Sequence, residues 1–394
     1  MRILSLHSSN NGAIGYYRSR IPARALRAAG HEVFYKEESS WYTWMKPTPE
    51  KWLLKHLGEF DFVLTDRLIL WEHLAMFAEY RNRSADCRLV VDFDDDFLTV
   101  PRWNMASKRY RTGHQFRDVS IAHLKLAEMT TVSTPTLAAK FREHTHALRL
   151  APNLIDPADW AGLPVDPERS GDPCLRILYG GAGGHFTDLD AIRPGLEAVL
   201  RNPPVPVRFI CLGALPLWLH EIERDLPGRV VNLPWVDLPD YPQASAWGGF
   251  DLAIAPLVAH PFNDAKSNVK WLEAGIQGIP LVCSKVGPYA ALPEGSAMRL
   301  DNTPQDWEAG LREVLTNADL RRSLAEAAQE EILANWTIDK AAETWQSILE
   351  EAATRPRILS LEDAGLAPQP DTPTESPAGA PQSEQTPPQE SPCP

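Results

Sequence analysis

The stretch Phe262–Ser284, FNDAKSNVKWLEAGIQGIPLVCS, combines a cationic helix start, an acidic residue on the helix and an apolar strand. Ser267 or Asn268 is suited to the N-cap of the helix, and a Gly-Ile-Pro sequence ends the helix where the strand over 279–284 begins. A helix followed at once by a short apolar strand indicates a parallel sheet whose two faces are both covered. The stretch therefore predicts an α/β fold.

The charges of this helix are placed for an anionic ligand. Lys266 precedes the capped end and Lys270 lies one turn in, where unpaired backbone N–H groups and the helix dipole favour a phosphate. Glu273 lies two turns beyond Lys266, so its carboxylate can accept hydrogen bonds from a hydroxyl-rich group such as a ribose. Together these groups suit a nucleotide-sugar. The same spacing also fits an ordinary amphipathic helix with solvated charges.

Composition favours a protein of two globular domains in a reducing compartment. The 394 residues are 44% hydrophobic, which is enough for two cores. The net charge of −13 argues against a nucleic-acid partner, because phosphate binding needs a basic face. The five cysteines are scattered without CxxC spacing and are interpreted as buried thiols rather than metal ligands or disulfides.

The first residues and the hydropathy pattern point to the cytoplasm. MRILSLHSS reads as a strand and turns polar too soon for a signal peptide. No apolar run reaches the length of a membrane-spanning helix. We expect a cytoplasmic protein, and peripheral contact with the inner face of the membrane stays open.

Apolar strand patterns alternate with helical patterns in two successive halves of the chain. The first half begins with a strand at 2–6, a Gly-bearing loop and a helix at 16–29. The second half restarts with a strand at 175–179, a Gly-rich loop and a helix at 185–200. Further strands are predicted at 31–35, 60–65, 88–93, 129–132, 207–213, 230–233, 251–256 and 279–284, and further helices at about 116–128, 133–144, 304–334 and 338–353.

This alternation predicts two doubly wound, Rossmann-like domains that face a cleft. A segment rich in Pro, Asp and Gly separates the halves, and a Pro-rich end with almost no large apolar residues is expected to be disordered. The predicted divisions are 1–156 for the N-terminal domain, 157–173 for the linker, 174–337 for the C-terminal domain, 338–357 for a closing helix and 358–394 for the tail.

An acidic run follows the predicted strand RLVVDF. Asp94, Asp95 and Asp96 come where open α/β sheets place their ligands, and they could hold Mg²⁺ or Mn²⁺, supply a general base, or cap the next turn. Alternation along the strand sends Asp92 and Asp94 to one face and Asp95 to the other. We therefore favour hydrogen bonding to a sugar or acceptor hydroxyl over a metal site.

GGAGGH at 180–185 joins a predicted strand to a helix. Its glycines let the backbone approach a phosphate or sugar, and the helix start supplies positive potential. The spacing matches neither GxGxxG nor the P-loop, which argues against a dehydrogenase or a kinase. A tight turn with a structural role alone remains an alternative.

These motifs, in this order, resemble those of GT-B glycosyltransferases, especially the enzymes of glycosyltransferase family 4, or group 1. The resemblance covers about 1–353 and rests on the Gly-bearing first loop, VVDFDDDF, APNLID, YGGAGGHFTDLD and KSNVKWLEAGIQGIPLVCS. It implies that the C-terminal domain binds the nucleotide-sugar and that the N-terminal domain faces the acceptor. The resemblance predicts donor contacts at Gly181, Gly183, Gly184, His185, Lys266, Ser267, Asn268, Lys270 and Glu273, and acceptor-side contacts at Asn11, Gly12 and Gly15.

The sequence departs from the family pattern at two places. Family 4 enzymes typically carry two glutamates separated by seven residues, and Ala265 stands at the first position, with Asp264 next to it as a candidate replacement. A histidine common at the end of an N-domain strand corresponds to Asp94. The catalytic candidates are therefore Asp94, Asp95 and Lys266, where a lysine at a helix start could stabilise the leaving diphosphate.

The predicted function is transfer of a sugar from a nucleotide-sugar to a hydroxyl of a cell-surface glycan, a lipid-linked sugar or a protein, with a role in polysaccharide biosynthesis. The resemblance implies retention of configuration and no cofactor or divalent metal. Two alternatives stay open: a non-catalytic sugar- or nucleotide-binding scaffold, and a glycosyltransferase that modifies nucleic acid.

Overall fold

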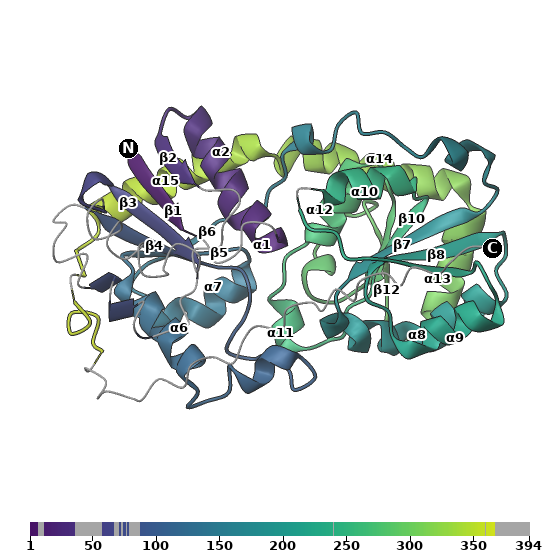
Figure 1. The fold of residues 1–394 in the computed structure, drawn as a ribbon, viewed down its shortest axis with the longest axis horizontal. Helices are drawn as coiled ribbons and strands as arrows, with labels where there is room; N and C mark the ends of the chain where they lie inside the picture. The colour runs from purple at the N-terminus through teal and green to yellow at the C-terminus, as the bar shows by residue number, and fades with distance from the viewer. Residues whose placement is uncertain are drawn as a thin grey trace, which may run out of the picture.

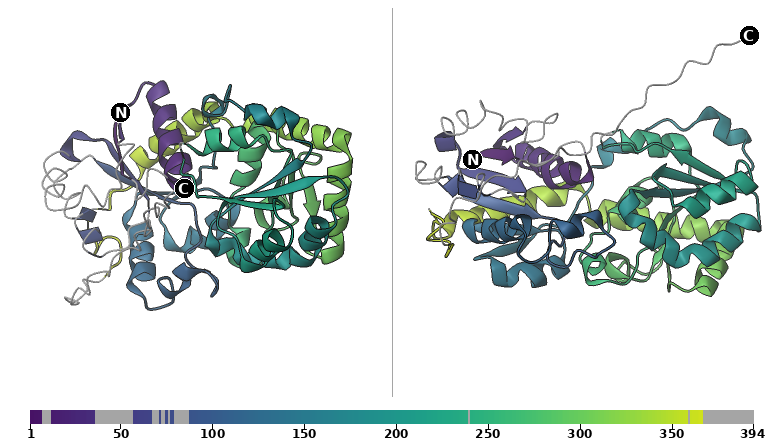
Figure 2. Two further views of the ribbon diagram at one scale, coloured as in Figure 1. Left: turned by 45° about the vertical axis from the view of Figure 1, so that its right-hand side comes forward. Right: turned by 60° about the horizontal axis from the view of Figure 1, so that its bottom comes forward.

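The structure is a computed structural model. It describes residues 1–6, 12–35, 57–66, 71, 74–75, 77–78, 87–238, 240–358 and 360–366. Most of the predicted tail, from residue 367 onward, lies outside the described residues. Two α/β domains lie side by side, with helices on both faces of each sheet (Figure 1), and the further views keep this arrangement (Figure 2).

The N-terminal domain is built on a parallel sheet of six strands in the order β2-β1-β3-β4-β5-β6. Its strands are β1 (Arg2–Leu6), β2 (Glu32–Tyr35), β3 (Phe62–Asp66), β4 (Arg88–Phe93), β5 (Met129–Val132) and β6 (Leu148–Leu150). Its helices are α1 (Ala13–Gly15), a π-helical turn (Tyr16–Arg20), α2 (Ile21–Ala28), α6 (Gln115–Leu126) and α7 (Pro135–Phe141). The strand order reverses between β1 and β3, where a doubly wound sheet opens a crevice.

The C-terminal domain repeats the design with the order β12-β11-β10-β7-β8-β9, again all parallel. Its strands are β7 (Leu175–Gly181), β8 (Val207–Gly213), β9 (Val230–Leu233), β10 (Leu252–Ala255), β11 (Leu281–Ser284) and β12 (Met298–Leu300). Its helices are α8 (Phe186–Arg201), α9 (Leu217–Asp225), α10 (Tyr241–Gly248), α11 (Pro261–Asp264), α12 (Val269–Ile276), α13 (Pro304–Thr316) and α14 (Ala318–Asn335). Here the reversal lies between β7 and β10.

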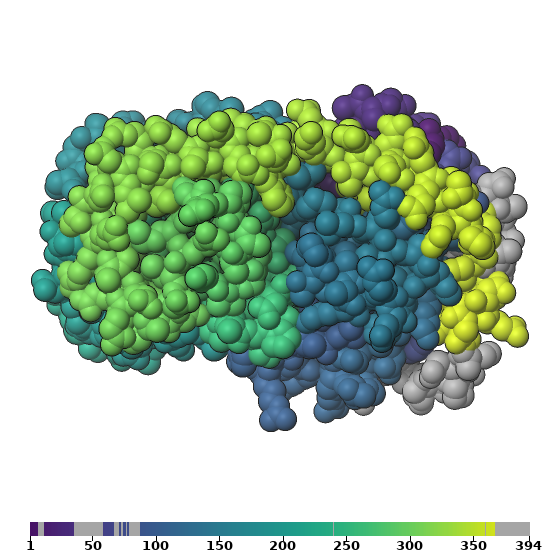
Figure 3. Space-filling model, turned by 180° about the vertical axis from the view of Figure 1, so that it is seen from behind, coloured from purple at the N-terminus to yellow at the C-terminus, as the bar shows by residue number. Residues whose placement is uncertain are grey.

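The last helix, α15 (Ile338–Thr354), returns to the N-terminal domain and packs against α2. Trp345, Ile348 and Leu349 are buried there in one apolar cluster with Ile21 and Leu26. The back of the molecule shows α14 and α15, in yellow-green, running along both domains (Figure 3). Helices α14 and α15 thus connect the two domains by packing against both.

The prediction of two doubly wound domains is confirmed, and β1, β4, β5, β8 and β9 have the predicted limits. Two local features differ. The helical pattern over 304–334 is divided at Asn317, which leaves helical geometry and caps α14 by accepting a hydrogen bond from the Leu320 N–H at 2.9 Å. The short strand β12 was not predicted, because Met298–Leu300 is only half-buried and gives a weak apolar pattern.

Candidate active site

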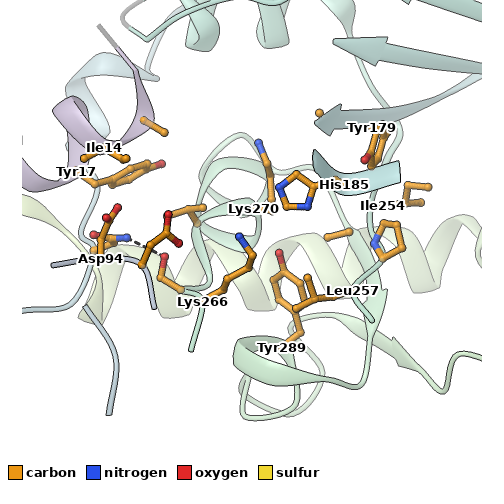
Figure 4. Close-up of a pocket in the computed structure, with 18 residues that line it drawn as sticks. Ile14, Tyr17, Asp94, Tyr179, His185, Ile254, Leu257, Lys266, Lys270 and Tyr289 are labelled. Carbon is orange, nitrogen blue, oxygen red and sulfur yellow. Dashed lines mark hydrogen bonds between the residues drawn. The ribbon is translucent and has the colours of Figure 1, made fainter. Parts of the chain in front are cut away.

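A cavity of about 220 Å³ lies between the domains at the strand reversal of the C-terminal sheet (Figure 4). The ends of β7 and β10 and the start of α12 supply one side, and α1 with the acidic run after β4 supplies the other. The lining residues are Ala13, Ile14, Tyr17, Asp94, Asp95, Asn153, Tyr179, Gly180, His185, Ile254, Ala255, Pro256, Leu257, Lys266, Ser267, Val269, Lys270 and Tyr289. The cavity therefore takes groups from both domains.

Lys266 and Ser267 line the cavity directly before α12. Asn268 occupies the N-cap position and is buried, but its side chain makes no capping hydrogen bond. The Lys266 Nζ lies 4.8 Å from the centre of the Phe262 ring, and it has no carboxylate partner among the described residues. In Figure 4 its side chain points into the cavity beside His185. A half-buried cation at a helix start is placed for an anion.

Glu273 lies one turn further along α12 and is only 4% exposed. The Lys270 ammonium donates to its Oε2 at 2.9 Å, and the Tyr17 hydroxyl of the N-terminal domain donates to its Oε1 at 3.2 Å. Burial opposes the Lys270 charge, but Glu273 and then Tyr241 raise the pKa of Lys270 above its ordinary value. Lys270 therefore stays charged at neutral pH. Both oxygens of the predicted ribose-binding carboxylate have protein partners here.

Gly180 explains how Lys270 reaches the end of β7. A Cβ at this position would lie 3.3 Å from the Lys270 Nζ and 3.2 Å from the Tyr241 hydroxyl. The Lys270 Nζ also lies 5.2 Å from the centre of the Tyr241 ring. A residue larger than glycine would thus make tight contact with the cation and require it to shift by a few tenths of an ångström.

His185 reaches the cavity from the start of α8, and Asp188 holds its ring. The His185 Nδ1 lies 2.8 Å from Asp188 Oδ2, while Asp188 Oδ1 accepts from the Val258 N–H at 2.8 Å and from Asn263 at 3.4 Å. Asp188 is 4% exposed. It therefore fixes the imidazole together with the loop after β10, and directs the other ring nitrogen toward the ligand space.

The Tyr179 hydroxyl is buried at the cavity without a hydrogen-bond partner among the described residues. Burial raises its pKa, so the hydroxyl keeps its proton. A buried hydroxyl without a partner costs about 1–3 kcal/mol, and a ligand oxygen in the cavity would remove that cost. Tyr289, which is also buried at the cavity, points its hydroxyl toward the same space in Figure 4.

Asp92 at the end of β4 and the three aspartates that follow it have different surroundings. Asp92 is buried in a bidentate ion pair with Arg18, at 2.6 and 2.8 Å, and Asp96 pairs with Lys140. Asp94 and Asp95 both line the cavity. The expectation that alternation would send Asp94 and Asp95 to opposite faces was wrong, because β4 ends at Phe93 and the chain turns there.

Asn153, from the APNLID motif, joins the two domains at the cavity. Its Oδ1 accepts from Arg18 at 2.8 Å, and its Nδ2 donates to the Ser267 hydroxyl at 2.8 Å. Arg18 is 1% exposed and also donates to the Ala151 carbonyl at 2.6 Å. The buried Arg18 guanidinium thus positions the Asn153 amide, which in turn hydrogen-bonds Ser267, one of the predicted donor contacts.

The glycines that line the cavity differ from those that were predicted to contact the donor. Gly181 belongs to β7, where its carbonyl accepts from the Ala214 N–H at 3.0 Å, and Gly183 and Gly184 are exposed at the turn that follows. None of these three described glycines lines the cavity, whereas Gly180 and His185 do. The strand runs two residues longer than predicted, so the motif approaches the ligand space with its first and last residues.

On the acceptor side, Asn11 lies outside the described residues. Gly12 is the N-cap of α1 and Gly15 is buried within it, and Ala13, Ile14 and Tyr17 of the same segment line the cavity in place of these two glycines.

Asp264 does not take the place of the missing family glutamate, because it is exposed and does not line the cavity. Ala265 is 1% exposed and packs in the N-domain core cluster, and its carbonyl accepts from Thr134 at 2.9 Å.

A smaller hollow of about 40 Å³ continues past Glu273 along the ends of β7, β8 and β9. Trp235, Val236 and Leu238 line it together with Tyr241, Lys270 and Glu273. Trp235 is 55% exposed, and its indole N–H donates to Asp237 at 2.7 Å. The hollow offers an apolar, partly aromatic surface next to a carboxylate. As for metal ions, no group of three or more His, Cys, Asp or Glu side chains suited to hold one occurs among the described residues.

Residues 193–347 match a protein family described as glycosyl transferase-like. No curated protein sequence matches the chain. Among solved structures, sucrose-phosphate synthase from Thermosynechococcus elongatus is similar at a TM-score of 0.61 and 15% identity, covering 89% of this chain and 99% of that one. Anabaena Alr3699/HepE in complex with UDP-glucose is similar at a TM-score of 0.62 and 16% identity, covering 90% and 100%. A TarM mutant from S. aureus is similar at a TM-score of 0.54 and 11% identity, covering 76% and 59%.

The chain has the GT-B glycosyltransferase fold. Together with the match over 193–347, this agrees with the predicted resemblance to GT-B glycosyltransferases. The structure contains no helix, among the described residues, that is long and apolar enough to cross a membrane.

Several residues of this site were not predicted from the sequence. Tyr17 and Arg18 lie on the π-helical turn after the first loop, a geometry that often marks functional positions but has no sequence signature. Asn153 was within a quoted motif and could have been singled out as a polar residue among buried ones. Tyr179 looked like an ordinary strand residue, and only its unsatisfied hydroxyl distinguishes it.

Proposed function

We propose that the protein transfers a sugar from a nucleoside diphosphate sugar to a hydroxyl acceptor, with the donor bound in the cavity at the start of α12. The observation that supports this proposal is the group of Lys266, Tyr179 and His185 around one space, where neither the Lys266 cation nor the Tyr179 hydroxyl has a partner in the described part of the chain that would compete with an anion. These groups supply a charge and hydrogen-bond donors to phosphate and sugar oxygens.

The donor is proposed to lie along the carboxyl ends of the C-terminal strands. The diphosphate would contact Lys266 and the amides around Ser267 and Asn268, and the ribose hydroxyls would reach Glu273. The hollow with Trp235 is proposed to take the nucleobase by stacking and apolar contact. The transferred sugar would then face Asp94, Asp95 and the N-terminal domain, where the acceptor enters.

In the reaction, the bond between the sugar carbon and the diphosphate oxygen breaks, and the acceptor hydroxyl forms the new bond and loses its proton. The diphosphate leaves with more negative charge than it had when bonded. Lys266 and the helix start would stabilise that charge without a metal ion. Asp94 or Asp95 would accept the proton or orient the acceptor hydroxyl. We propose retention of configuration as part of this function.

We also propose that the acceptor is a cell-surface glycan precursor, a lipid-linked sugar or a protein, and that the enzyme acts in the cytoplasm. HepE was solved with UDP-glucose and the TarM mutant with UDP and alpha-GlcNAc-glycerol, so UDP-sugars are the first donors to screen.

The test measures the melting temperature with UDP-, GDP-, ADP- and dTDP-sugars, since a ligand that binds the native state raises it. Lys266→Ala should abolish the shift given by the best donor and lower kcat/KM by about 100- to 1000-fold, the usual effect of losing one group that stabilises transition-state charge. Lys285→Ala removes an exposed lysine outside the cavity and serves as the control. Equal donor shifts in both variants would contradict the diphosphate assignment.

Glu273→Ala tests the ribose assignment separately. It should weaken donor binding by about 10- to 100-fold, the value of hydrogen bonds to a charged group. The loss should be smaller for a sugar phosphate without a nucleoside, which cannot reach Glu273. A variant that binds the intact donor as well as the parent protein does would show that the ribose lies elsewhere.

A further inference from the structure

A basic segment stands out from this acidic chain. Residues 101–117 contain five Lys or Arg and no Asp or Glu, whereas the whole chain carries a net charge of −13. Its exposed cations are Arg102, Lys108, Arg109 and Arg111. None of these four has a carboxylate partner in the part of the chain that the structure describes. The fifth cation, Arg117, has a structural role, because it donates to the Leu98 carbonyl at 2.8 Å.

The same segment exposes two large apolar side chains. Met105 is 89% exposed and Trp103 is 44% exposed, although such residues are usually buried in a monomer. They flank Asn104, whose side chain accepts from the Ala106 N–H at 2.9 Å and starts a short 3₁₀ helix over Met105–Lys108. Tyr110, which is 8% exposed, packs against Phe97 and anchors the inner side of the segment. The segment thus presents its apolar and cationic groups from a packed base.

This segment lies at the rim of the site. Arg102 follows Asp95 of the cavity by seven residues, so at most about 25 Å of chain separates them. The Trp103 ring packs edge-on against His260, with 5.0 Å between ring centres, and His260 caps the helix α11 that leads to Lys266. In Figure 1 the segment is the blue part of the chain at the lower edge of the molecule, beside α11. A surface docked there would meet the mouth of the interdomain cavity.

We propose that residues 102–111 form a docking surface for an anionic lipid bilayer. Trp103 and Met105 enter the headgroup region, where an indole with its polar N–H is favoured, and the four exposed cations contact lipid phosphates. The rest of the chain is acidic and is repelled by the same bilayer, so the protein binds with this edge toward the lipid. The bilayer then delivers an acceptor to the cavity rim.

The pairing of charge with exposed apolar groups favours a bilayer over a soluble polyanion. A soluble polyanion would use the cations alone and would meet repulsion from the remaining surface. It offers no apolar phase for a thioether side chain that is 89% exposed. The inference does not depend on the proposed activity, because bilayer binding is measured without donor or acceptor.

The test is co-sedimentation of the full chain with vesicles of phosphatidylcholine, alone or mixed with phosphatidylglycerol. The parent protein should sediment with the anionic vesicles and not with the neutral ones, and added salt should weaken binding. Removing three charges in K108Q/R109Q/R111Q should lower the partition coefficient by about 100-fold, since each cation near an anionic surface contributes close to a factor of five. W103S/M105S should lower it by 10-fold or more with the charge unchanged.

The matched control is R201Q/R224Q/R322Q, which removes the same charge from exposed positions of the C-terminal domain. It should bind the anionic vesicles at least half as well as the parent protein does. Equal losses in the two triple variants would overturn the proposal, because binding would then follow net charge alone. Circular dichroism of each variant checks that it is folded.

A second arm replaces the vesicles with a single-stranded oligonucleotide as a soluble polyanion. The proposal is wrong if the parent protein binds the oligonucleotide and not the vesicles, or if W103S/M105S binds anionic vesicles as the parent does. The donor-induced rise in melting temperature of W103S/M105S reports on the cavity independently, so a failed docking surface and a failed donor site are distinguished.

Discussion

The two domains share a sheet design but use the carboxyl ends of their strands differently. These strand ends form one edge of each sheet. In the N-terminal domain protein side chains fill this edge, because Arg18 pairs with Asp92 and holds Asn153. In the C-terminal domain the same edge stays open as the cavity with Lys266 at its border. A further ionic cluster lies at the opposite edge of the C-terminal sheet, where Asp172 accepts from the side chains of Arg176 and Arg208 at 2.9–3.1 Å.

This difference suggests a division of labour. A sheet edge that carries its own ion pair is rigid and cannot exchange it for a ligand, so the N-terminal domain serves as a fixed wall. At the C-terminal edge Lys270 is paired with Glu273, but Lys266 has no carboxylate partner among the described residues and can take an anion. Contacts between the two edges include the Asn153 amide donating to the Ser267 hydroxyl and the Tyr17 hydroxyl donating to Glu273. The predictions below test the filled edge, then the opposite edge, then the contact between the domains.

The largest effect is expected from breaking the filled edge. Arg18→Met removes one partner of a fully buried pair and leaves Asp92 charged and desolvated, which should lower the free energy of unfolding by about 3–5 kcal/mol. Urea denaturation monitored by circular dichroism measures this change. The double variant R18M/D92L should recover part of the loss, since it leaves no unpaired charge.

The control for Arg18 is an exposed pair. Arg322 contacts Asp319 on α14, with side-chain exposures of 64% and 86%, and Arg322→Met should change stability by no more than about 0.5 kcal/mol. If the two single variants lose the same free energy, the Arg18–Asp92 pair does not organise the N-terminal edge and the contrast between the domains fails.

The opposite edge of the C-terminal sheet should respond to acid. The Cys174 N–H, followed by Arg176 and Arg208, lowers the pKa of Asp172 to about 2 from 3.8. A lowered pKa stabilises the fold above pH 3.8, and this contribution disappears as the pH falls toward 2. Asp172→Asn should therefore cost about 1–2 kcal/mol at neutral pH and nothing near pH 2.

Urea titrations of Asp172→Asn and the parent protein at several pH values measure this dependence. Asp319→Asn, which changes an exposed carboxylate, should leave the acid dependence near that of the parent. A constant difference between parent and Asp172→Asn across the acid range would mean that the loss comes from packing rather than ionisation, and the ionic role of this edge would be refuted.

Much of the fold could be predicted because its signals are local. Apolar runs of four to seven residues between Gly, Pro and Asn gave most strands, and the cap and periodicity of 268–276 gave α12. Lys266, Lys270 and Glu273 lie near one another as predicted by the helical spacing, because they belong to one helix and its start. Such relations depend on residues only a few positions apart.

The rest of the site depends on pairs that are distant in sequence. Arg18 and Asp92 are separated by 74 positions, and Tyr17 and Glu273 by 256, so a single sequence contains no local signal for either pair. The end of the strand before the glycine motif was mispredicted for a different reason. The apolar pattern ends at Tyr179, but β7 continues through Gly181 because it pairs with β8 up to Gly213. A glycine pair can extend a ladder that side-chain patterns cannot reveal.

The smallest effect is expected at the contact that joins the two edges. Burial, and then the charge of Glu273, raise the pKa of Tyr17 well above its ordinary value, so its hydroxyl keeps its proton at neutral pH and donates it to Glu273. If a ribose hydroxyl takes the position that this donor occupies, 3.2 Å from Glu273 Oε1, it displaces the tyrosine hydroxyl. Tyr17→Phe should then tighten donor binding by about 2- to 10-fold, the net value of one hydrogen bond.

Isothermal titration with the donor measures that gain, and Tyr16→Phe is the matched control. Tyr16 sits beside Tyr17 on the same turn, but its hydroxyl donates to Asp159 at 2.9 Å and does not contact Glu273, so its loss should leave the donor Kd unchanged. Weaker binding in Tyr17→Phe alone would reverse the interpretation. The tyrosine would then hold Glu273 in the orientation that the ribose requires, and the N-terminal domain would help to build the donor site instead of competing with the donor for its carboxylate.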